Sequence, residues 1–508
     1  MIAHIWDRFR WVYCQLDTLR RCFPPSIRKT LDELPATLDE TYERTLEGIP
    51  KEKRHHAHLL FQCLVAAVEP LDVEELAEIF AIDFDLGTVT APYLMDAWRP
   101  ENPEEAILST CSTLISVIHN VYGYIVQFSH FSVKEFLISD RLRTSEVGNI
   151  RNNHIRLDAA HTLLARACLT VLLHLDEPPV KKQFGIFPLA FYAARHWVEH
   201  AKYENVAPQV QDAMEELFNP SKPYLTSWVW IHNEDVAWIR NSINPGTDDR
   251  PRPDGTALYY AVLCGLSGPA KYLISTHGED VNAKCGNHGT PLHAASNKGH
   301  LDAVSLLLGH GAEVNATNEH GRTPLWEAYC GLHLPVMQLL LEHGAAPDVR
   351  CRPFGLLTHD ASLCGRAEVI RLLLQHNADV NTTSVSNYTP LHFASLSGHV
   401  DVAQILLEHG ANIDALSEHG TPLFRAVDNG HFDVTRLLLE RGADIQIRGR
   451  HHLTPFQVAT QKRKTKIAQL LLEHGADKEW MVCDNTPDKH RSWITSTLFS
   501  DPRYSSFH

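Results

Sequence analysis

The sequence predicts a mainly α-helical protein in which a helical N-terminal half precedes a solenoid of repeated helix pairs with β-hairpin fingers. Three observations support this prediction. A Thr-Pro-Leu-His motif and its variants recur about every 33 residues through the C-terminal half. The N-terminal half shows helical spacing of apolar residues and one strand-turn-strand pattern. The length of 508 residues suggests three or so domains at roughly 150 residues each.

The composition limits the classes of protein to which this chain can belong. Hydrophobic residues at 44% and charged residues at 21% are typical of a globular chain. A net charge of -15 argues against nucleic acid or an anionic membrane as the main partner. The 11 Cys include no C-x-x-C pair and are interpreted as reduced thiols. With no signal peptide and no apolar run of ~18 residues, we expect a cytoplasmic protein, with the nucleus as the alternative compartment.

The recurring motif opens seven units, and its residues explain their structure. Thr and Pro start a first helix, a Gly turns the chain near the middle of the unit, and a Leu triplet supplies the buried stripe of a second helix. A Gly-Ala-x-Val-Asn segment then opens a hairpin. The repeated His is interpreted as a structural residue that bonds neighbouring backbone. The units begin at residues 256, 290, 323, 356, 389, 421 and 454.

This pattern resembles the ankyrin repeat, which has the same period and the signature T-P-L-H-x-A. The resemblance covers residues 254–479 and implies an ankyrin-repeat α-solenoid with β-hairpin fingers, followed by a tail at 480–508. The unit at Leu356 lacks Thr-Pro and follows an unusual hairpin over 350–354, which predicts a locally loosened stack.

The first and last units are expected to cap the stack. In the last unit, a basic cluster occupies positions that an eighth repeat would cover. A solvated cap face is favoured there over a nuclear localisation signal. The cluster consists of Lys462, Arg463, Lys464 and Lys466.

The N-terminal half contains a winged-helix-like pattern. Apolar spacing predicts helices at about 34–46 and 58–68, and Asp72 could cap a third. Two strands at 114–118 and 124–128 flank a turn, and a helix at 131–139 closes the block. We place this winged-helix-like domain at 51–145. A helical spacer follows at 146–245, and its aromatic residues at helical spacing are expected to be core.

A second resemblance involves three segments of this half. They read WVYCQLD from Trp11, LPATLDETY from Leu34 and FSHFSVKEFL from Phe128. They resemble the region after the NTPase core in fungal NACHT proteins, which are STAND ATPases related to NLR immune receptors and often carry C-terminal ankyrin repeats. The helical segment at 1–50 then resembles the end of a NACHT module. The sequence contains no Gly-Lys pair, hence no G-x-x-x-x-G-K-[ST] phosphate loop, so we expect no ATP hydrolysis by this chain alone and no cofactor.

The same resemblance points to His130. In such relatives the His of a winged-helix F-x-H-x-S motif contacts the phosphates of the nucleotide, and His130 matches that position. This role is implied only where an NTPase core is present. In the isolated chain the favoured interpretation is that His130 caps or packs beside the closing helix, since a lone donor cannot hold a nucleotide.

One motif suggests an enzyme. His196, Glu199 and His200 spell H-x-x-E-H, which on a helix would place two imidazoles on one face for zinc. Such a match is easily found in a chain with 32 His, and no further acidic ligand follows in a recognisable context. Zinc metallopeptidase is therefore the minor alternative, and we expect neither a catalytic residue nor a metal site.

These observations lead to a non-enzymatic interaction module. The solenoid is expected to bind a protein ligand through its hairpin tips and concave helix surface, because these are free of the stacking core. It would be attached to the regulatory rear part of a NACHT-type signalling receptor. The alternative is a regulatory subunit that docks on a STAND NTPase core in trans. The candidate contacts for the protein partner are Asn318, His320, Arg322, Trp326, Tyr329, Ser386, Asn387, Tyr388, Arg448 and Arg450.

Overall fold

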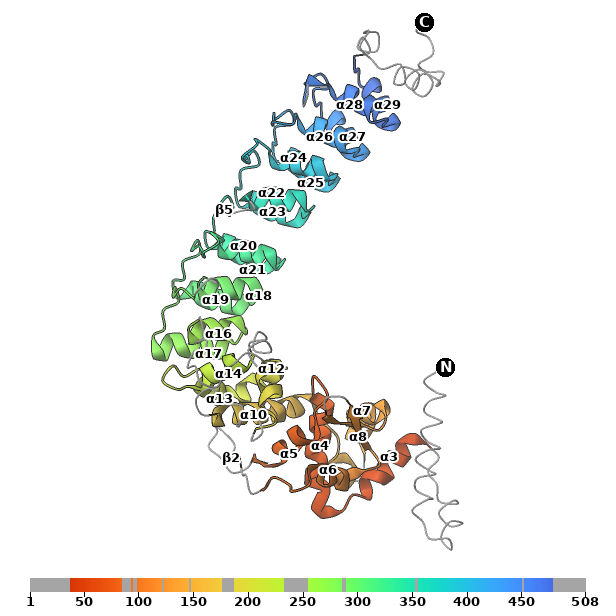
Figure 1. Ribbon diagram of the computed structural model, residues 1–508, viewed down its shortest axis with the longest axis vertical. Coiled ribbons are helices and arrows are strands. Elements are labelled where there is room, and N and C mark those ends of the chain that lie inside the picture. Colours follow the sequence, from red (N-terminus) through yellow and green to blue (C-terminus); the bar gives the residue numbers. More distant parts are fainter. Residues whose placement is uncertain are drawn as a thin grey trace, which may run out of the picture. The chain divides into compact units, whose positions relative to one another are not determined.

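The protein forms two mainly helical units, Met1–Glu279 and Asp280–His508 (Figure 1). The predicted linker at 244–253, the tail at 480–508 and most of the segment at 1–50 lie outside the described residues. None of the described helices is long and apolar enough to cross a bilayer. The computed structural model describes residues 37–84, 93–94, 98–120, 123–145, 148–175, 187–232, 255–285, 289–351, 355–449 and 452–477.

A helical domain with a two-stranded hairpin makes up the first part of the first unit. Its elements are α3 (Leu38–Glu47), the 3-10 turn η2 (Lys51–Lys53), α4 (Arg54–Ala66), α5 (Val73–Phe80), β1 (Ile82–Asp83), β2 (Tyr93–Leu94), α6 (Pro103–Cys111), β3 (Ile115–Asn120), β4 (Gly123–Phe128), α7 (Phe131–Leu137), α8 (Asp140–Arg143) and α9 (Gly148–Arg151). The predicted hairpin is present, because β3 and β4 pair antiparallel with Ile118 opposite Ile125. Asp72 caps α5 as predicted, with Oδ1 accepting from the Glu75 backbone N–H at 2.8 Å.

Two details of this domain differ from the sequence prediction. Helix α4 begins at Arg54, earlier than the predicted start at residue 58, and ends at Ala66 because Ala67 leaves the helical conformation. Helix α6 was not predicted. Its start is typical of helices, with Asn102 accepting from a backbone N–H of the first turn and Pro103 at the first helical position.

The second part of the first unit is the helical spacer. Its elements are α10 (Leu157–His174), α12 (Ala190–Ala201), the 3-10 turn η4 (Ala207–Gln209), α13 (Gln211–Leu217) and α14 (Tyr224–His232). Helix α10 packs against α4, α12, α13 and α14. The aromatic side chains are core, as predicted: the rings of Trp197 and Trp228 meet edge to face at 5.5 Å, and both are fully buried.

Buried cysteines lie where α4 and α10 pack. Cys63 and Cys168 are both fully buried. Burial raises the pKa of the Cys63 thiol to about 12 and also raises the pKa of Cys168. A thiol held protonated in this way is unreactive, which makes both residues structural.

The helices of the first ankyrin-type repeat belong to the first unit. They are α16 (Ala257–Leu263), α17 (Ser267–Tyr272) and the π-helical turn η5 (Leu273–His277). Helix α17 packs against α13. A Cβ at Gly268 would meet the side-chain amide of Gln211, which shows how closely the two helices approach. The first repeat therefore continues the spacer's helix packing on this side.

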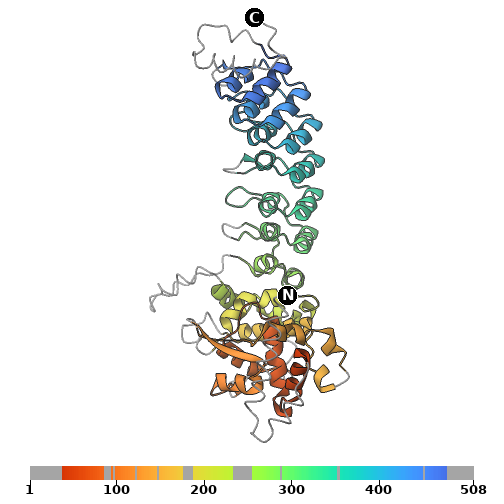
Figure 2. The same ribbon diagram turned by 90° about the vertical axis from the view of Figure 1, so that its right-hand side faces the viewer.

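The second unit is a stack of helix pairs. The loops that separate the pairs project from one side of the helices in Figure 2 and are termed fingers. The pairs are α18 (Pro291–Lys298) and α19 (Leu301–Gly309), α20 (Pro324–Cys330) and α21 (Leu334–Glu342), α22 (Leu357–Leu363) and α23 (Ala367–Gln375), α24 (Pro390–Ser397) and α25 (Val400–Glu408), α26 (Pro422–Asn429) and α27 (Phe432–Glu440), and α28 (Pro455–Gln461) and α29 (Thr465–Glu473). Five of these first helices begin at a Thr-Pro pair. One finger also contains a short antiparallel pair, β5 (Arg350–Cys351) with β6 (Gly355–Leu356).

The stack loosens between α20 and α22, as the sequence predicts for the unit at Leu356. First helices approach each other closely at α18–α20, α22–α24 and α24–α26, and that close approach is largely absent between α20 and α22 (Figure 1). Trp326 and Tyr329 of α20 are buried there, at positions where α24 carries His392 and Ser395. We infer that these larger side chains hold the two helices apart. The junction between α20 and α22 is termed the joint.

Candidate protein-binding surface

The repeated Thr-Pro-Leu-His segment forms a hydrogen-bond network at the base of each finger. Nδ1 of His392 accepts from the Thr389 backbone N–H at 3.1 Å and lies 2.9 Å from its hydroxyl. Nε2 of the same ring donates to the carbonyl of Gly420 in the next finger at 3.0 Å. His293 makes the equivalent bonds in its own repeat. The structural role predicted for the repeated His is confirmed.

Asparagine side chains connect several of the fingers to the next. Oδ1 of Asn315 accepts from the Ala346 backbone N–H at 2.8 Å, and Nδ2 donates to the carbonyl of Gly344 at 3.1 Å. Asn282 and Asn381 repeat this pattern. These bonds fix the spacing of the fingers through their backbones and leave the side chains at the tips available.

The first predicted contact finger carries Asn318, His320 and Arg322. Oδ1 of Asn318 accepts from the backbone N–H groups of His320 and Arg322, both at 3.0 Å. Its Nδ2 donates to Oε1 of Glu327, which also lies 3.6 Å from the Arg322 guanidinium. Asn318 and Arg322 are half-buried and shape the finger, whereas His320 is exposed at the tip. A partner contact by these residues stays a prediction.

The second predicted finger carries Ser386, Asn387 and Tyr388. Asn387 is exposed and has a left-handed backbone with φ of 60°. Ser386 is half-buried, and Tyr388 is only 9% exposed. The Tyr388 ring packs 5.3 Å from His392, and the Arg425 guanidinium lies 5.7 Å above it. Asn387 therefore forms the tip of this finger, and Tyr388 packs behind the tip against His392 and Arg425.

The third predicted finger carries Arg448 and Arg450, and only Arg448 lies among the described residues. Arg448 is exposed, and its Nη1 donates to the carbonyl of His452 at 3.2 Å. Arg450 lies outside the described residues.

The predicted aromatic contact on a first helix has little surface. Trp326 is 3% exposed and Tyr329 is 6% exposed, and their rings meet edge to face at 5.8 Å. Both side chains pack inside the stack at the joint, which leaves little surface for the partner contact predicted at these two residues.

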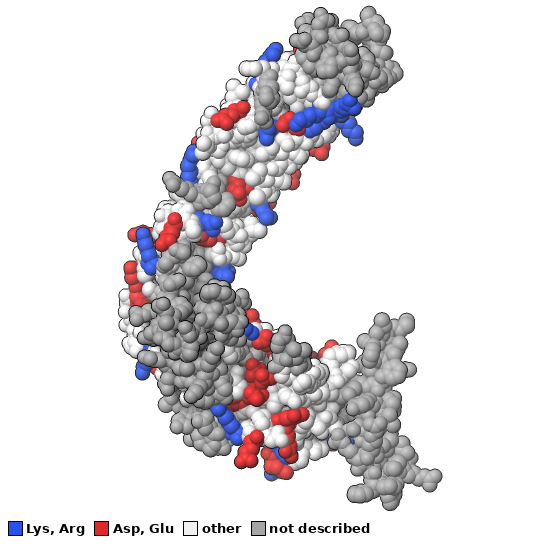
Figure 3. Space-filling model, in the orientation of Figure 1, with Lys and Arg blue, Asp and Glu red and all other residues white. Residues whose placement is uncertain are grey.

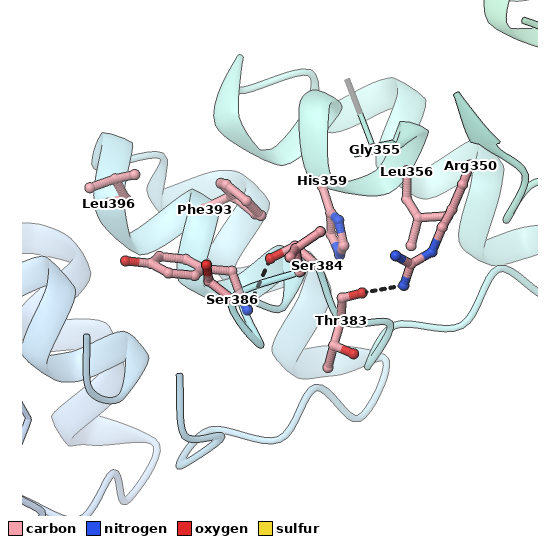
Figure 4. Close-up of a pocket in the computed structure, with 11 residues that line it drawn as sticks. Arg350, Gly355, Leu356, His359, Thr383, Ser384, Ser386, Phe393 and Leu396 are labelled. Atoms are coloured by element: carbon pink, nitrogen blue, oxygen red, sulfur yellow. Dashed lines mark hydrogen bonds between the residues drawn. The ribbon is translucent and has the colours of Figure 1, made fainter. Parts of the chain in front are cut away.

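A pocket beside α22 was missed by the sequence analysis (Figure 4). It has a volume of about 340 Å³ and lies between the finger of Arg350 and the finger of residues 383–388. Its one local signal in the sequence is the missing Thr-Pro at Leu356, a residue that lines the pocket. The lining residues are Arg350, Gly355, Leu356, His359, Thr383, Ser384, Val385, Ser386, Tyr388, Phe393 and Leu396.

The basic cluster of the last repeat gathers cations at the C-terminal end of the stack (Figure 3). Nζ of Lys464 donates to the carbonyls of Val427 and Asp428, at 3.1 and 2.8 Å, and Lys462 also bonds Asp428. Other repeats have a His at the position of Lys464. The ring of that His bonds a backbone carbonyl in the first helix of the preceding repeat, as His431 does. These contacts support the cap interpretation, while Arg463 and Lys466 are exposed.

His130 caps helix α7 in the first unit. Its Nδ1 accepts from the Ser132 backbone N–H at 3.3 Å and lies 2.6 Å from the Ser132 hydroxyl. That hydroxyl also lies 2.8 Å from the hydroxyl of Tyr42. The geometry agrees with the favoured interpretation of a helix cap, and the phosphate role stays a prediction that depends on an NTPase core.

The H-x-x-E-H segment lies on α12, where its two imidazoles have different environments. His200 is fully buried, with Nδ1 2.9 Å from Nδ1 of His161 and Nε2 2.9 Å from the hydroxyl of Tyr192. Burial lowers the pKa of His200 to about 3. Nε2 of His196 lies 3.1 Å from the carboxylate of Glu69. Both nitrogens of His200 are occupied, and the described part of the chain holds no group of three or more His, Cys, Asp or Glu suited to a metal ion.

Two family models match this chain. One describes ankyrin repeats and matches residues 258–351, 357–417 and 414–481. The other describes the winged helix domain of GPI inositol-deacylase and matches residues 42–148. The relation to NACHT proteins stays a prediction.

A curated relative and several solved structures are similar to parts of the chain. The azaphilone pigments biosynthesis cluster protein L of Monascus ruber is 31% identical over 300 residues, which cover 55% of this chain and 60% of the relative. This chain thus spans less than two thirds of that relative's length. The human ASB11 ankyrin repeat domain is 30% identical over 44% of this chain and 99% of its own, with a TM-score of 0.38. The ankyrin repeat domain of Bcl-3 is 27% identical over 43% and 99%, with a TM-score of 0.39. The chain carries ankyrin repeats and a winged helix domain similar to that of GPI inositol-deacylase.

Proposed function

We propose that this chain is a non-enzymatic interaction protein whose fingers and first helices, in the second unit, capture a protein ligand. One observation carries the proposal. The repeated Thr and His side chains, the groups most suited to chemistry, bond each other and the neighbouring backbone. Side chains at the finger tips, among them His320, Val385 and Asn387, remain exposed.

The finger network also favours binding energetically. A loop that is disordered before binding loses conformational freedom on association, which weakens affinity. Here the asparagine bonds and the His392 bond to Gly420 already hold neighbouring fingers in place. The fingers are therefore pre-organised, and an exposed tip residue can contact a partner with little ordering of backbone.

Site-specific photocrosslinking in the full-length chain tests this proposal. A photoreactive amino acid is placed at His320 or at Asn387, and the cells that express the protein are irradiated. Gln404 is the control position, since it is exposed on α25, the second helix of its repeat. We expect both finger positions to crosslink to the same protein and Gln404 to give no such product. Equal crosslinking from all three positions contradicts the proposal.

A second candidate function concerns the winged helix domain. Large apolar side chains are exposed on β3, β4 and α7, namely Ile118, Tyr124 and Phe131. Exposed apolar groups of this kind favour docking to another protein. They support a regulatory role in which this domain binds a NACHT-type NTPase core in trans, and His130 would contact phosphate only in that complex.

Co-purification of the full chain with a NACHT-type NTPase core from the same genome tests the second candidate. We expect a double Ile118→Asp and Tyr124→Asp variant to lose the complex, and a Val385→Asp variant to retain it. Retention by both variants, or absence of any complex with the unchanged chain, rejects docking through this domain.

A further inference from the structure

The pocket beside α22 lies at a repeat that departs from the pattern of the others. In the repeat that begins at Thr389, the Thr backbone N–H and hydroxyl lie against Nδ1 of His392. In the fourth repeat Leu356 stands at the Thr position. Nδ1 of His359 makes no hydrogen bond within the described residues, and His359 lines the pocket. A ring nitrogen without an internal partner can bond a ligand that enters the pocket.

The tautomer of His359 follows from its other nitrogen. Nε2 lies 3.1 Å from the carbonyl of Thr382 and 3.3 Å from the hydroxyl of the same residue. Because the nearer carbonyl can only accept, we assign the ring proton to Nε2. Nδ1 of the neutral ring is therefore an acceptor. Burial is the main cause that lowers the pKa of His359, and the charge of Arg350 lowers it further, so the ring stays neutral at physiological pH. The pocket thus offers a hydrogen-bond acceptor to a donor on the ligand.

The rest of the pocket is mainly apolar, with one cation. The side chains of Leu356, Phe393 and Leu396 line it (Figure 4). Val385 also lines the pocket and is 93% exposed. Among the eleven described residues that line it, Arg350 alone carries a permanent charge. The Arg350 side chain is exposed, and its Nη2 donates to the carbonyl of Thr383 at 2.7 Å.

We propose that this pocket holds an apolar side chain from an extended segment of the partner protein, with an adjacent peptide N–H donating to Nδ1 of His359 and a nearby carboxylate paired with Arg350. The volume, near the lower end of the ~300–1,000 Å³ of ligand pockets, suits one large side chain and its peptide group. The pocket lies between two fingers, and its lining includes Ser386 and Tyr388, the neighbours of Asn387 in the sequence. This inference rests on the proposed function and names the part of the partner that the solenoid recognises.

Selection of phage-displayed random peptides on the full-length chain tests the inference. We expect enriched peptides to share a large apolar residue with Asp or Glu close to it in sequence. Binding of a synthetic copy is then measured by fluorescence polarisation. Arg350→Glu should weaken binding by on the order of tenfold, because it replaces the pairing cation with an anion. Arg371→Glu is the matched control, since Arg371 is exposed on α23, the second helix of its repeat, and does not line the pocket; binding should not change.

A second variant tests the acceptor without removing it. Leu356→Thr restores the residue that other repeats carry and gives Nδ1 of His359 an internal donor. We expect this variant to fold, as its sister repeats do, and to bind the peptide several-fold more weakly. Circular dichroism verifies that both pocket variants are folded before binding is compared.

The outcomes separate this inference from the proposed function. If the finger positions crosslink to a partner but neither Arg350→Glu nor Leu356→Thr weakens peptide binding, the result supports the finger surface and rejects the pocket assignment. Enrichment of no apolar-acidic motif also overturns the assignment. If the peptides bind in the pocket and the finger positions give no common partner, the proposed finger surface falls instead.

Discussion

The hydroxyl of Tyr329 donates a hydrogen bond of 2.6 Å to Oδ2 of Asp360 across the joint between α20 and α22. Burial, followed by the carboxylate of Asp360, raises the pKa of Tyr329 well above its usual value. The bond joins two repeats whose first helices otherwise make few close backbone contacts. The stability of a stack of repeats includes a contribution from each interface between neighbours. At the joint, where other contacts are few, this single bond supplies a large share of that contribution.

The variant Tyr329→Phe should therefore weaken the joint. Removing the hydroxyl leaves a half-buried carboxylate without this donor, and a hydrogen bond to a charged group contributes about 2 kcal/mol. We expect urea denaturation to show a loss of that size, with faster hydrogen exchange in α22. Tyr272→Phe is the control, since the Tyr272 hydroxyl contacts only the exposed His277 in the described structure and its loss should cost less than about 0.5 kcal/mol. Equal losses in the two variants contradict the prediction.

One hydrogen bond of the finger network is missing at Asp348, and a single substitution should restore it. Asp348 stands where other fingers have Asn315 and Asn381, and its Oδ2 accepts from the Asp379 backbone N–H at 3.0 Å. Its Oδ1 is buried without a partner, because a carboxylate has no N–H for the next carbonyl. We expect Asp348→Asn to raise the free energy of unfolding by about 1 kcal/mol at neutral pH.

The pH dependence of this gain has a definite sign. Burial, and then the charge of Asp379, raises the pKa of Asp348 in the folded protein. A raised carboxyl pKa means that this group stabilises the fold when protonated and loses that contribution as the pH rises. The advantage of Asn over Asp should therefore shrink as the pH falls toward the Asp pKa. Asn315→Asp is the reverse control and should be destabilising at neutral pH; a stabilising effect would count against the network.

Local patterns explain most of what the sequence could predict. The Asp72 cap, the β3–β4 hairpin and the buried stripe of Tyr42 and Leu46 depend on residues a few positions apart, so their spacing alone indicates them. The same holds for the repeated Thr-Pro-Leu-His unit, where His392 bonds a Thr three residues away.

The features that were missed depend on contacts between repeats. The exposure of Trp326 and Tyr329 depends on whether the next repeat covers their helix, which the unit's own sequence does not determine. The pocket combines Arg350, Val385 and Phe393, which come from different fingers and helices. Its one local signal, the missing Thr at Leu356, indicates an irregular repeat but gives no pocket volume or lining.

The H-x-x-E-H segment should bind no zinc. His200 uses both ring nitrogens inside the spacer, and turning it toward solvent would break its contacts with His161 and Tyr192. We expect isothermal titration of zinc into the unchanged chain and into His196→Ala to give the same curve, with no zinc-dependent cleavage of peptides. Zinc-dependent cleavage that Glu199→Gln abolishes would falsify this prediction.

His392 should make the solenoid sensitive to mild acid. Burial lowers its pKa from 6.5 to about 4, although the hydrogen bond that its Nε2–H donates to Gly420 acts in the opposite direction. The unfolded chain takes up a proton near pH 6.5 and the folded chain near pH 4, so stability is complete above pH 6.5 and falls as the pH drops between these values. The loss is on the order of 3 kcal/mol for this residue.

The last repeat supplies the matched variant for this test. Gln457 occupies the His position there, and its Oε1 accepts from the Thr454 backbone N–H at 2.8 Å without titrating. We expect His392→Gln to keep the cap and to reduce the slope of unfolding free energy against pH between about 6.5 and 4, measured by urea denaturation. Because His293 and His359 also have lowered pKa values, part of the slope should remain. An unchanged slope in His392→Gln would mean that the buried imidazole does not carry the acid sensitivity.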